Sequence, residues 1–440
     1  MADPRGGRLT EKVGIGFWPT MALIVAAGVG LRVLHTLLVA PWPPGFFNDE
    51  AYYRTLAALV VQGAGFVRPG EFYGAGISVP TAERAPLYPL MLAGLAELGV
   101  TGPDPQRLLG ALTGGGTIVA LGLVARELAG DRAGLLAAGI AAAYPTLIAA
   151  DGALMTESLY GLLAALMLLS ALKLQMTERW RWAVALGVAG GLAALTRGEG
   201  LLLTVILLLG FLRHPAGRRA AAVAFLAFAV VLAPWTIRNY SVFDRPVLVA
   251  TEGGETLAGA NCGSTYGGEL LGRWDVNCVK LSGKGNEAEQ ADKLGHDGLH
   301  YAADHVERVP VVLAVRQLRT WGLWEPLQRS EGRAQWVVTL GVVVYALLVP
   351  LAVYGFVLLR RRRAPMWVVV TPLITVVVST ALSYGSVRFR HSAELAFVVL
   401  AAVALDHLLR RRTVPVKAPP VGSTQPPSPG QGALHGLRNR

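Results

Sequence analysis

Long apolar runs separated by short polar segments recur along most of the chain. Most of these runs approach the ~17–25 residues that a helix needs to cross a bilayer, so the pattern predicts membrane-spanning helices. We expect ten spans, at residues 15–40, 107–127, 133–150, 157–175, 181–197, 199–213, 219–238, 334–359, 365–384 and 391–409. The first run has no small-residue cleavage site before the stretch "PWPP" at 41–44, which indicates a retained span rather than a signal peptide.

The composition agrees with this pattern. Hydrophobic residues make up 53% of the 440 residues and charged residues 16%, and the mean hydropathy is +0.46, which is too apolar for an ordinary soluble protein. The net charge of +11 could indicate a nucleic-acid partner. The basic residues cluster in short segments between apolar runs, however, as they do in cytoplasmic loops, so we expect a membrane and no nucleic acid.

Charge bias also predicts the orientation. Between Pro89 and Glu97 the apolar stretch is too short for a span, and counting it as one would place the arginines at 360–363 and 410–412 outside. We therefore interpret 86–100 as an interfacial or re-entrant helix. The prediction is an all-α polytopic membrane protein with both termini in the cytoplasm.

This topology divides the chain into segments. They are a cytoplasmic N-terminus (1–14), a membrane core with a long exterior loop (15–240, loop 41–106), an exterior subdomain (241–333), C-terminal spans (334–409) and a disordered cytoplasmic tail (410–440). The exterior subdomain begins with the Gly-rich stretch "TEGGETLAGANCGSTYGGELLG", which is typical of an adaptable loop. We expect Gly253 and Gly254 in a loop that closes over the substrate, and a helix at about 286–308.

The only cysteines, Cys262 and Cys278, both fall in the exterior subdomain. A disulfide is the simplest interpretation of such a pair, and two free thiols are the alternative. Glycines in the spans, at 110, 114, 187, 190 and 191, are more typical of helix-packing seams than of functional sites.

The stretch "FNDEAYY" places Asp49 and Glu50 just beyond the first span, at the head of a predicted helix with Asn48 as its cap. Acids in a first turn are also favoured by the helix dipole, so this pair alone indicates no chemistry. Other ionisable residues, however, fall at the same outer face: Glu83, Arg84, Glu157, Arg197, Arg238, Arg388 and Arg390. Because charge near a bilayer is costly, such residues usually have a partner or a substrate. Arginines at one face can bind an anionic lipid headgroup, and a carboxylate there can act as a proton acceptor.

These residues stand in motifs that resemble the C-type glycosyltransferases, in particular the family 39-like protein mannosyltransferase and aminoarabinose transferase group. The matching motifs are "NDEAYYRTLAALVVQG", "ERAPLYPLMLAGL", "YPTLIAADGALMTESLYGLL", "LAALTRGEGLL", "APWTIRNY" and "YGSVRFRHSAELAFVVLAA". The resemblance implies a GT-C fold of about ten transmembrane helices, with interfacial helices in the first exterior loop. It also implies inverting transfer of a sugar from a polyprenyl-phosphate donor at an extracytoplasmic active site.

By this resemblance Asp49 matches the catalytic aspartate, Glu83 with Arg84 the acidic–basic pair before the prolines, and Glu157 a second acidic position that is usually aspartate. Glu50 would support Asp49 or orient the acceptor. We expect Arg84, Arg238, and Arg197 or Arg388 to bind the donor phosphate, whose oxygens suit guanidinium. Arg84 replaces the lysine of the aminoarabinose transferases, and Ala85 the first of two prolines, which leaves the sugar open.

Several alternatives stay open. A divalent cation held by Asp49, Glu83 and Glu157 is one, since hard cations prefer carboxylates. The donor sugar (mannose, arabinose, aminoarabinose or glucose) and the acceptor (lipid, glycan or protein) are not specified. The Ala/Gly/Arg-rich composition suggests a bacterial inner membrane. The rival function is a lipid-linked-sugar transporter or flippase, although its sites usually lie near the bilayer midplane.

Three further residue groups have predicted roles that are not catalytic. Arg32, in the outer half of the first span, is expected to reach toward the interface or to pair with an outer acid. The histidines at 296, 300 and 305 are interpreted as a polar helix face rather than metal ligands. Trp321 and Trp324 are typical of an interfacial aromatic belt, with sugar stacking as the alternative.

Overall fold

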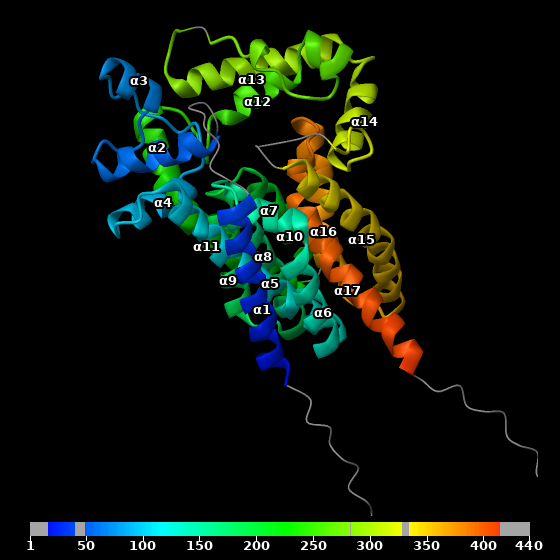
Figure 1. Ribbon diagram of the computed structural model, residues 1–440. Coiled ribbons are helices and arrows are strands. Elements are labelled where there is room, and N and C mark those ends of the chain that lie inside the picture. The colour runs from blue at the N-terminus through cyan, green and yellow to red at the C-terminus, as the bar shows by residue number, and fades with distance from the viewer. Residues whose placement is uncertain (1–15, 40–48, 214, 282, 328–333, 414–440) are drawn as a thin grey trace, which may run out of the picture.

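The computed structural model describes residues 16–39, 49–213, 215–281, 283–327 and 334–413 (Figure 1). Within these residues the regular elements are helices, with one isolated β-bridge between Val67 and Pro80. Apolar helices form a bundle, and α12 and α13 lie across its upper end beside α2, α3 and α4. Helix α1 begins and α17 ends at the opposite end of the bundle. The predicted terminal segment 1–14, most of the tail at 410–440 and the proposed cap Asn48 lie outside the described residues.

The bundle contains a helix at each of the ten predicted spans. They are α1 (Phe17–Leu34, continued by a π-helical turn His35–Val39), α5 (Pro103–Ala129), α6 (Asp131–Ala143) with α7 (Pro145–Asp151), α8 (Thr156–Thr177), α9 (Trp180–Ala194), α10 (Glu199–Phe211), α11 (Pro215–Phe243), α15 (Gln335–Arg361), α16 (Met366–Leu382) and α17 (His391–Thr413). Six are long and apolar enough to cross a membrane alone, and the bent pair α6–α7 would be a seventh span. That the shorter α9, α10 and α16 also cross stays a prediction.

The remaining helices gather at the upper end of the bundle (Figure 1). They are α2 (Asp49–Val61), α3 (Pro69–Ala75), α4 (Leu87–Glu97), α12 (Glu252–Ala260), α13 (Glu287–Asp304) and α14 (Val309–Thr320), together with 3-10 turns at Gly263–Thr265, Gly268–Leu270, Val276–Cys278 and Val387–Arg390. Helix α4 is short, as predicted for 86–100. Helix α13 confirms the helix predicted at about 286–308 and begins at a reciprocal capping box between Asn286 and Glu289.

The Gly-rich stretch after residue 250 was predicted to be a loop, and this is wrong for its first part. Residues Glu252–Ala260 form α12, so Gly253 and Gly254 are helical. A Cβ on Gly254 would stand 2.0 Å from the carbonyl oxygen of Ala291 in α13. The glycine therefore allows two helix backbones to touch, which outweighs its low helix propensity.

The predicted glycine seams in the bundle are confirmed. A Cβ on Gly110 would lie 1.9 Å from the carbonyl oxygen of Asp151, and one on Gly114 would lie 2.3 Å from the Asp151 carboxylate. A Cβ on Gly187 would lie 2.1 Å from the carbonyl oxygen of Ala224. These glycines let α5 approach α7, and α9 approach α11, at backbone contact distance.

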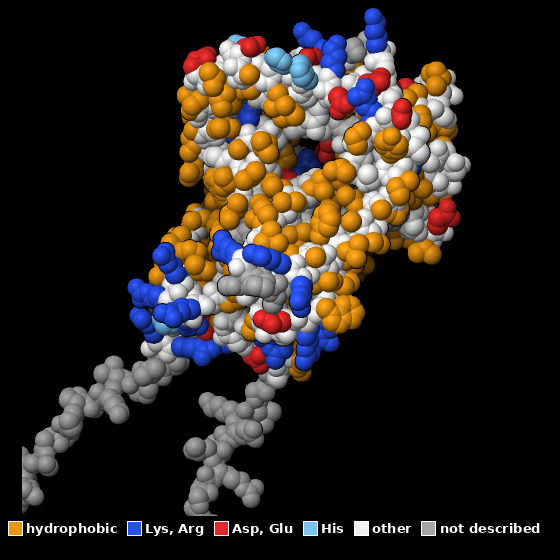
Figure 2. Space-filling view, turned by 180° about the vertical axis from the view of Figure 1, so that it is seen from behind, with side chains coloured by type: hydrophobic (Ala, Val, Ile, Leu, Met, Phe, Trp, Pro, Cys, Tyr) orange, Lys and Arg blue, Asp and Glu red, His pale blue; other side chains and the backbone are white. Residues whose placement is uncertain are grey.

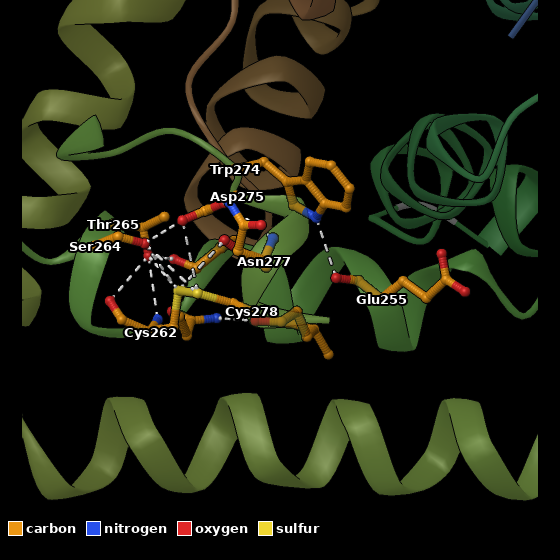
Figure 3. The surroundings of a disulfide bond; sticks show 12 residues. Glu255, Cys262, Ser264, Thr265, Trp274, Asp275, Asn277 and Cys278 are labelled. Atoms are coloured by element: carbon orange, nitrogen blue, oxygen red, sulfur yellow. Dashed lines mark hydrogen bonds between the residues drawn. A yellow bond between two sulfur atoms is a disulfide. The ribbon is translucent and has the colours of Figure 1, made fainter. Parts of the chain in front are cut away.

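Cys262 and Cys278 form the predicted disulfide (Figure 3). The loop that it closes is attached to α12, because the indole N–H of Trp274 donates to the carbonyl oxygen of Glu255 at 3.1 Å. Ser264 donates to the carboxylate of Asp275 at 2.6 Å beside the sulfur atoms. The disulfide therefore fixes the segment that packs on α12 at the upper end of the bundle.

Candidate active site

A cavity of about 820 Å³ lies between the bundle and the helices α12 and α13 at its upper end. Its walls come from distant parts of the chain: the head of α2, the α9–α10 turn, residues 246–254, one face of α13, and the end of α16 with the following turn. Figure 2 shows a hollow at this level with acidic and basic side chains in its depth. Asp49, Arg84, Arg197 and Arg388 are among its lining residues.

Asp49 lies between two arginines. Its carboxylate accepts hydrogen bonds from Arg84 at 3.2 Å and from Arg388 at 3.1 Å, one on each oxygen. Burial opposes ionisation, but the two guanidinium charges hold the pKa of the Asp49 carboxyl below its ordinary value. Asp49 also begins α2, as the dipole argument requires. Asp49 is therefore both an acid in the first turn of a helix and a carboxylate held by two arginines at the cavity. It is ionised at neutral pH.

Glu157 is the second carboxylate bound by two arginines. It lies in the first turn of α8 and is buried. Arg197 approaches its carboxylate at 2.9 Å, and Arg388 contacts the same oxygen. Arg388 therefore bridges Asp49 and Glu157, and Arg197 adds a third cation from the α9–α10 turn.

Glu83 and Arg84 follow the β-bridged segment of the first exterior loop. The hydroxyl of Tyr52 donates to Glu83 at 3.1 Å, and Arg84 lies 3.6 Å from the same carboxylate. Burial, which outweighs the nearby Arg84 charge, raises the pKa of Glu83 to about 7. Arg84 also forms an ion pair with Glu252 at the start of α12.

Four of the proposed site residues, Glu50, Glu83, Glu157 and Arg238, are not among the cavity-lining residues, although Glu83 and Glu157 contact arginines that are. Glu50 is buried and is not among the cavity-lining residues. Arg238 donates to the carbonyl oxygens of Thr81 at 2.9 Å and Phe66 at 3.0 Å. The structure therefore does not bring Arg238 to the other arginines, because its guanidinium binds the backbone of the first exterior loop.

The proposed metal ligands do not fit a metal ion. Asp49 and Glu157 are each bound by two guanidinium groups, so cations already neutralise them. The hydroxyl of Tyr52 donates to Glu83. In the part of the chain that the structure describes, no three His, Cys, Asp or Glu side chains are grouped to hold a metal.

The other predicted roles have mixed outcomes. Arg32 pairs with Asp151 at 2.6 Å inside the bundle, which confirms a partner acid but leaves this arginine away from the cavity. The rings of His296 and His300 lie with their centroids 4.4 Å apart and are tilted relative to each other. Trp321 and Trp324 are not among the lining residues of the cavity.

Sequence reasoning missed Glu252 and the functional contact of Glu199. Glu199 lies 3.3 Å from Arg197. The two residues are two positions apart in the sequence "RGEG", so this ion pair could have been predicted. Glu252 stands in a polar exterior stretch that contains many acids, so no local signal separates it. Tyr384 and Phe389, which also line the cavity, form an aromatic pair at 4.8 Å between ring centroids.

Part of the chain matches a known protein family. Residues 83–237, which include Glu83, Arg84, Glu157 and Arg197, match the family described as dolichyl-phosphate-mannose-protein mannosyltransferase. No curated protein matches the chain.

Solved structures resemble the fold. The archaeal oligosaccharyltransferase AglB from Archaeoglobus fulgidus, in complex with an inhibitory peptide and a dolichol-phosphate, is 16% identical with a TM-score of 0.55, covering 90% of this chain and 50% of that one. The apo form of the Archaeoglobus fulgidus oligosaccharyltransferase is 17% identical, also with a TM-score of 0.55, covering 90% and 51%. ArnT from Cupriavidus metallidurans bound to undecaprenyl phosphate is 16% identical with a TM-score of 0.44, covering 88% and 77%.

This chain spans about half the length of the oligosaccharyltransferases that it resembles. The resemblance expected from the sequence motifs is nevertheless confirmed, and the chain has the fold of the GT-C glycosyltransferases.

Proposed function

We propose that this chain is an integral-membrane inverting glycosyltransferase, which moves a sugar from a polyprenyl-phosphate donor to an acceptor on the extracytoplasmic face. The observation that carries the proposal is the position of Asp49 on the cavity wall between Arg84 and Arg388. One ionised carboxylate next to several guanidinium groups is the combination that a base and an anionic leaving group require.

In the proposed reaction the donor phosphate binds the guanidinium groups of Arg84, Arg388 and Arg197. An acceptor hydroxyl attacks the anomeric carbon from the face opposite the phosphate, and its proton passes to Asp49. The bond between the anomeric carbon and the phosphate oxygen breaks, and its electron pair stays on polyprenyl phosphate. The arginines stabilise the charge that develops there, and attack from the opposite face inverts the anomeric centre.

The carboxylates around Asp49 have supporting roles in this proposal. Glu157 holds Arg197 and Arg388 in place, since it contacts both. Glu83 lies beside Arg84 and Tyr52, where it orients the arginine.

The distribution of charge supports an extracytoplasmic cavity. Figure 2 shows Lys and Arg side chains gathered at the lower end of the bundle, opposite the hollow. Arginines lie in or beside the α5–α6, α8–α9 and α15–α16 connections, at positions 126, 132, 179, 181 and 360–363. By the positive-inside rule the lower end faces the cytoplasm. A bacterial inner membrane and a polyprenyl carrier remain part of the proposal.

The substrates are proposed only as classes. The donor is a polyprenyl-phosphate sugar, and the acceptor is a lipid, glycan or protein. AglB was solved with dolichol-phosphate and a peptide, and ArnT with undecaprenyl phosphate. These ligands support a lipid phosphate on the donor side of this cavity.

The test is release of polyprenyl phosphate by the purified chain in nanodiscs. It would be given polyprenyl-phosphate mannose, arabinose, aminoarabinose and glucose in turn, with a membrane extract as acceptor source. Asp49→Asn should abolish release while leaving the thermal transition in place. Asp131→Asn is the matched control, because Asp131 also pairs with an arginine, at 2.7 Å, but at the far end of the bundle. Transbilayer movement of the lipid without cleavage would support the flippase instead and overturn the proposal.

A further inference from the structure

The arginines at the cavity are shared among more carboxylates than there are arginines. Arg84 contacts Asp49, Glu83 and Glu252. Arg388 contacts Asp49 and Glu157, and Arg197 contacts Glu157 and Glu199. An incoming phosphate is itself an anion, so it must compete with a carboxylate for at least one guanidinium group.

Glu252 is the carboxylate that differs from the rest. It belongs to the exterior helix α12 rather than to the bundle or the first loop. Its side chain is 34% exposed, close to the 31% of Asp49 and above the 24% of Glu83, the 14% of Glu199 and the 3% of Glu157. In the described part of the chain its ion pair is with Arg84 alone, whereas Asp49 and Glu157 each contact two arginines. A half-buried carboxylate with one arginine partner is easier to displace than Asp49 or Glu157, which two arginines hold.

The Glu252 side chain can leave Arg84 without unfolding α12. The backbone of the first turn is held by Trp274, which donates to the carbonyl oxygen of Glu255, and by the contact of Gly254 with Ala291. Thr251, just before the helix, donates to Glu287 at 2.8 Å. Displacement of the Glu252 side chain is therefore a local change at the cavity wall.

We infer that Glu252 competes with the lipid phosphate for Arg84, and that its return to Arg84 promotes release of polyprenyl phosphate after transfer. This inference rests on the proposed function. The donor phosphodiester carries one negative charge, whereas the product monoester carries up to two. The product therefore binds the arginines more strongly than the donor does, and a competing carboxylate next to them limits how long it stays.

The inference is tested by the affinity for polyprenyl phosphate itself, which needs no sugar and no turnover. Glu252→Gln keeps the shape of the side chain and removes its charge. We expect this variant in nanodiscs to bind polyprenyl phosphate about tenfold more tightly than the wild type, a change of about 1.4 kcal/mol. Its product inhibition should strengthen by a similar factor, and kcat and KM should both fall because release of the product becomes slower. A merely structural role would not tighten product binding.

Asp292→Asn is the matched control. Asp292 also lines the cavity, but its carboxylate pairs with Arg245 at 3.3 Å. This variant should bind polyprenyl phosphate like the wild type.

The affinities of the wild type and the two variants for polyprenyl phosphate distinguish the inference from the proposed function. Equal affinity of wild type and Glu252→Gln, with sugar transfer intact, overturns the inference and leaves the proposed function standing. Equal tightening by Asp292→Asn also overturns it, because the effect would then be general electrostatics. Failure of the wild type to bind polyprenyl phosphate would overturn the proposed function together with the inference.

Discussion

The carboxylate of Glu287 accepts a hydrogen bond from the backbone N–H of Ala82 at 2.7 Å. It also accepts from Thr81 at 2.7 Å, Thr251 at 2.8 Å and Arg68 at 3.0 Å. This buried carboxylate joins α13 to the residues just before Glu83 and Glu252. The relative position of Arg84 and Glu252 at the cavity therefore depends on one acid outside it.

Replacing Glu287 should weaken the exterior helices and the site together. Glu287→Ala leaves a buried N–H and two hydroxyl groups without this acceptor, so we expect a loss of about 3 kcal/mol in the free energy of unfolding. Transfer should fall with it. Glu289→Ala, in the exposed capping box of the same helix, should lose about 1 kcal/mol. Denaturant titration in detergent measures both, and equal losses would contradict the prediction.

Arg388 tests the importance of a guanidinium fork. Arg388→Lys keeps the charge but cannot bridge Asp49 and Glu157 with two separate N–H groups. We expect the rate of polyprenyl-phosphate release to fall about 10²–10³-fold, as for loss of a preorganised contact to a developing anion. Arg181→Lys, an exposed arginine at the head of α9, is the control and should keep full activity. A rate for Arg388→Lys within threefold of the wild type, roughly 0.6 kcal/mol, would refute the proposed role.

Glu83 predicts a pH dependence of stability. Burial raises its pKa to about 7 in the folded chain, above the ordinary 4.5. The folded state therefore holds a proton that the unfolded state releases, and stability should fall as the pH rises from about 4.5 to about 7. Thermal transitions in nanodiscs between pH 5 and pH 8 should show this loss in the wild type and less of it in Glu83→Gln. Glu97→Gln, an exposed acid at the end of α4, should retain the wild-type profile.

The sequence predicted the helices because each span must bury its backbone and expose apolar side chains, and both requirements appear in the local pattern. Motif order also identified Asp49, Glu83, Arg84, Glu157, Arg197 and Arg388, which the structure connects through ion pairs. These residues come from five separate segments. Their spacing along the chain does not indicate that they share a site, so only the resemblance to a known family could predict it.

The failures have physical reasons as well. Gly253 and Gly254 look like loop residues, but contact with α13 decides their conformation, and that contact lies about 40 residues away in sequence. Arg238, an arginine at the outer end of a predicted span, was expected to bind phosphate. In the structure its guanidinium group donates to backbone carbonyl oxygens instead. Glu252 and Glu287 are acids in a polar segment, so only tertiary structure separates them from their solvent-exposed neighbours.

Arg32 and Asp151 form a buried ion pair inside the bundle. Arg32 is fully buried and contacts Asp151 at 2.6 Å, and it also donates to carbonyl oxygens of α1 and α6. Removing one partner leaves an uncompensated buried charge, so Arg32→Met and Asp151→Leu should each cost about 3–5 kcal/mol in the free energy of unfolding. The double variant should cost less than the sum, because neither charge then remains. The same cycle on Arg126 and Asp131, a more exposed pair at the other end of the bundle, should give a coupling below about 1 kcal/mol. If denaturant titrations gave the two pairs equal coupling, the stabilising role of the buried pair would be disproved.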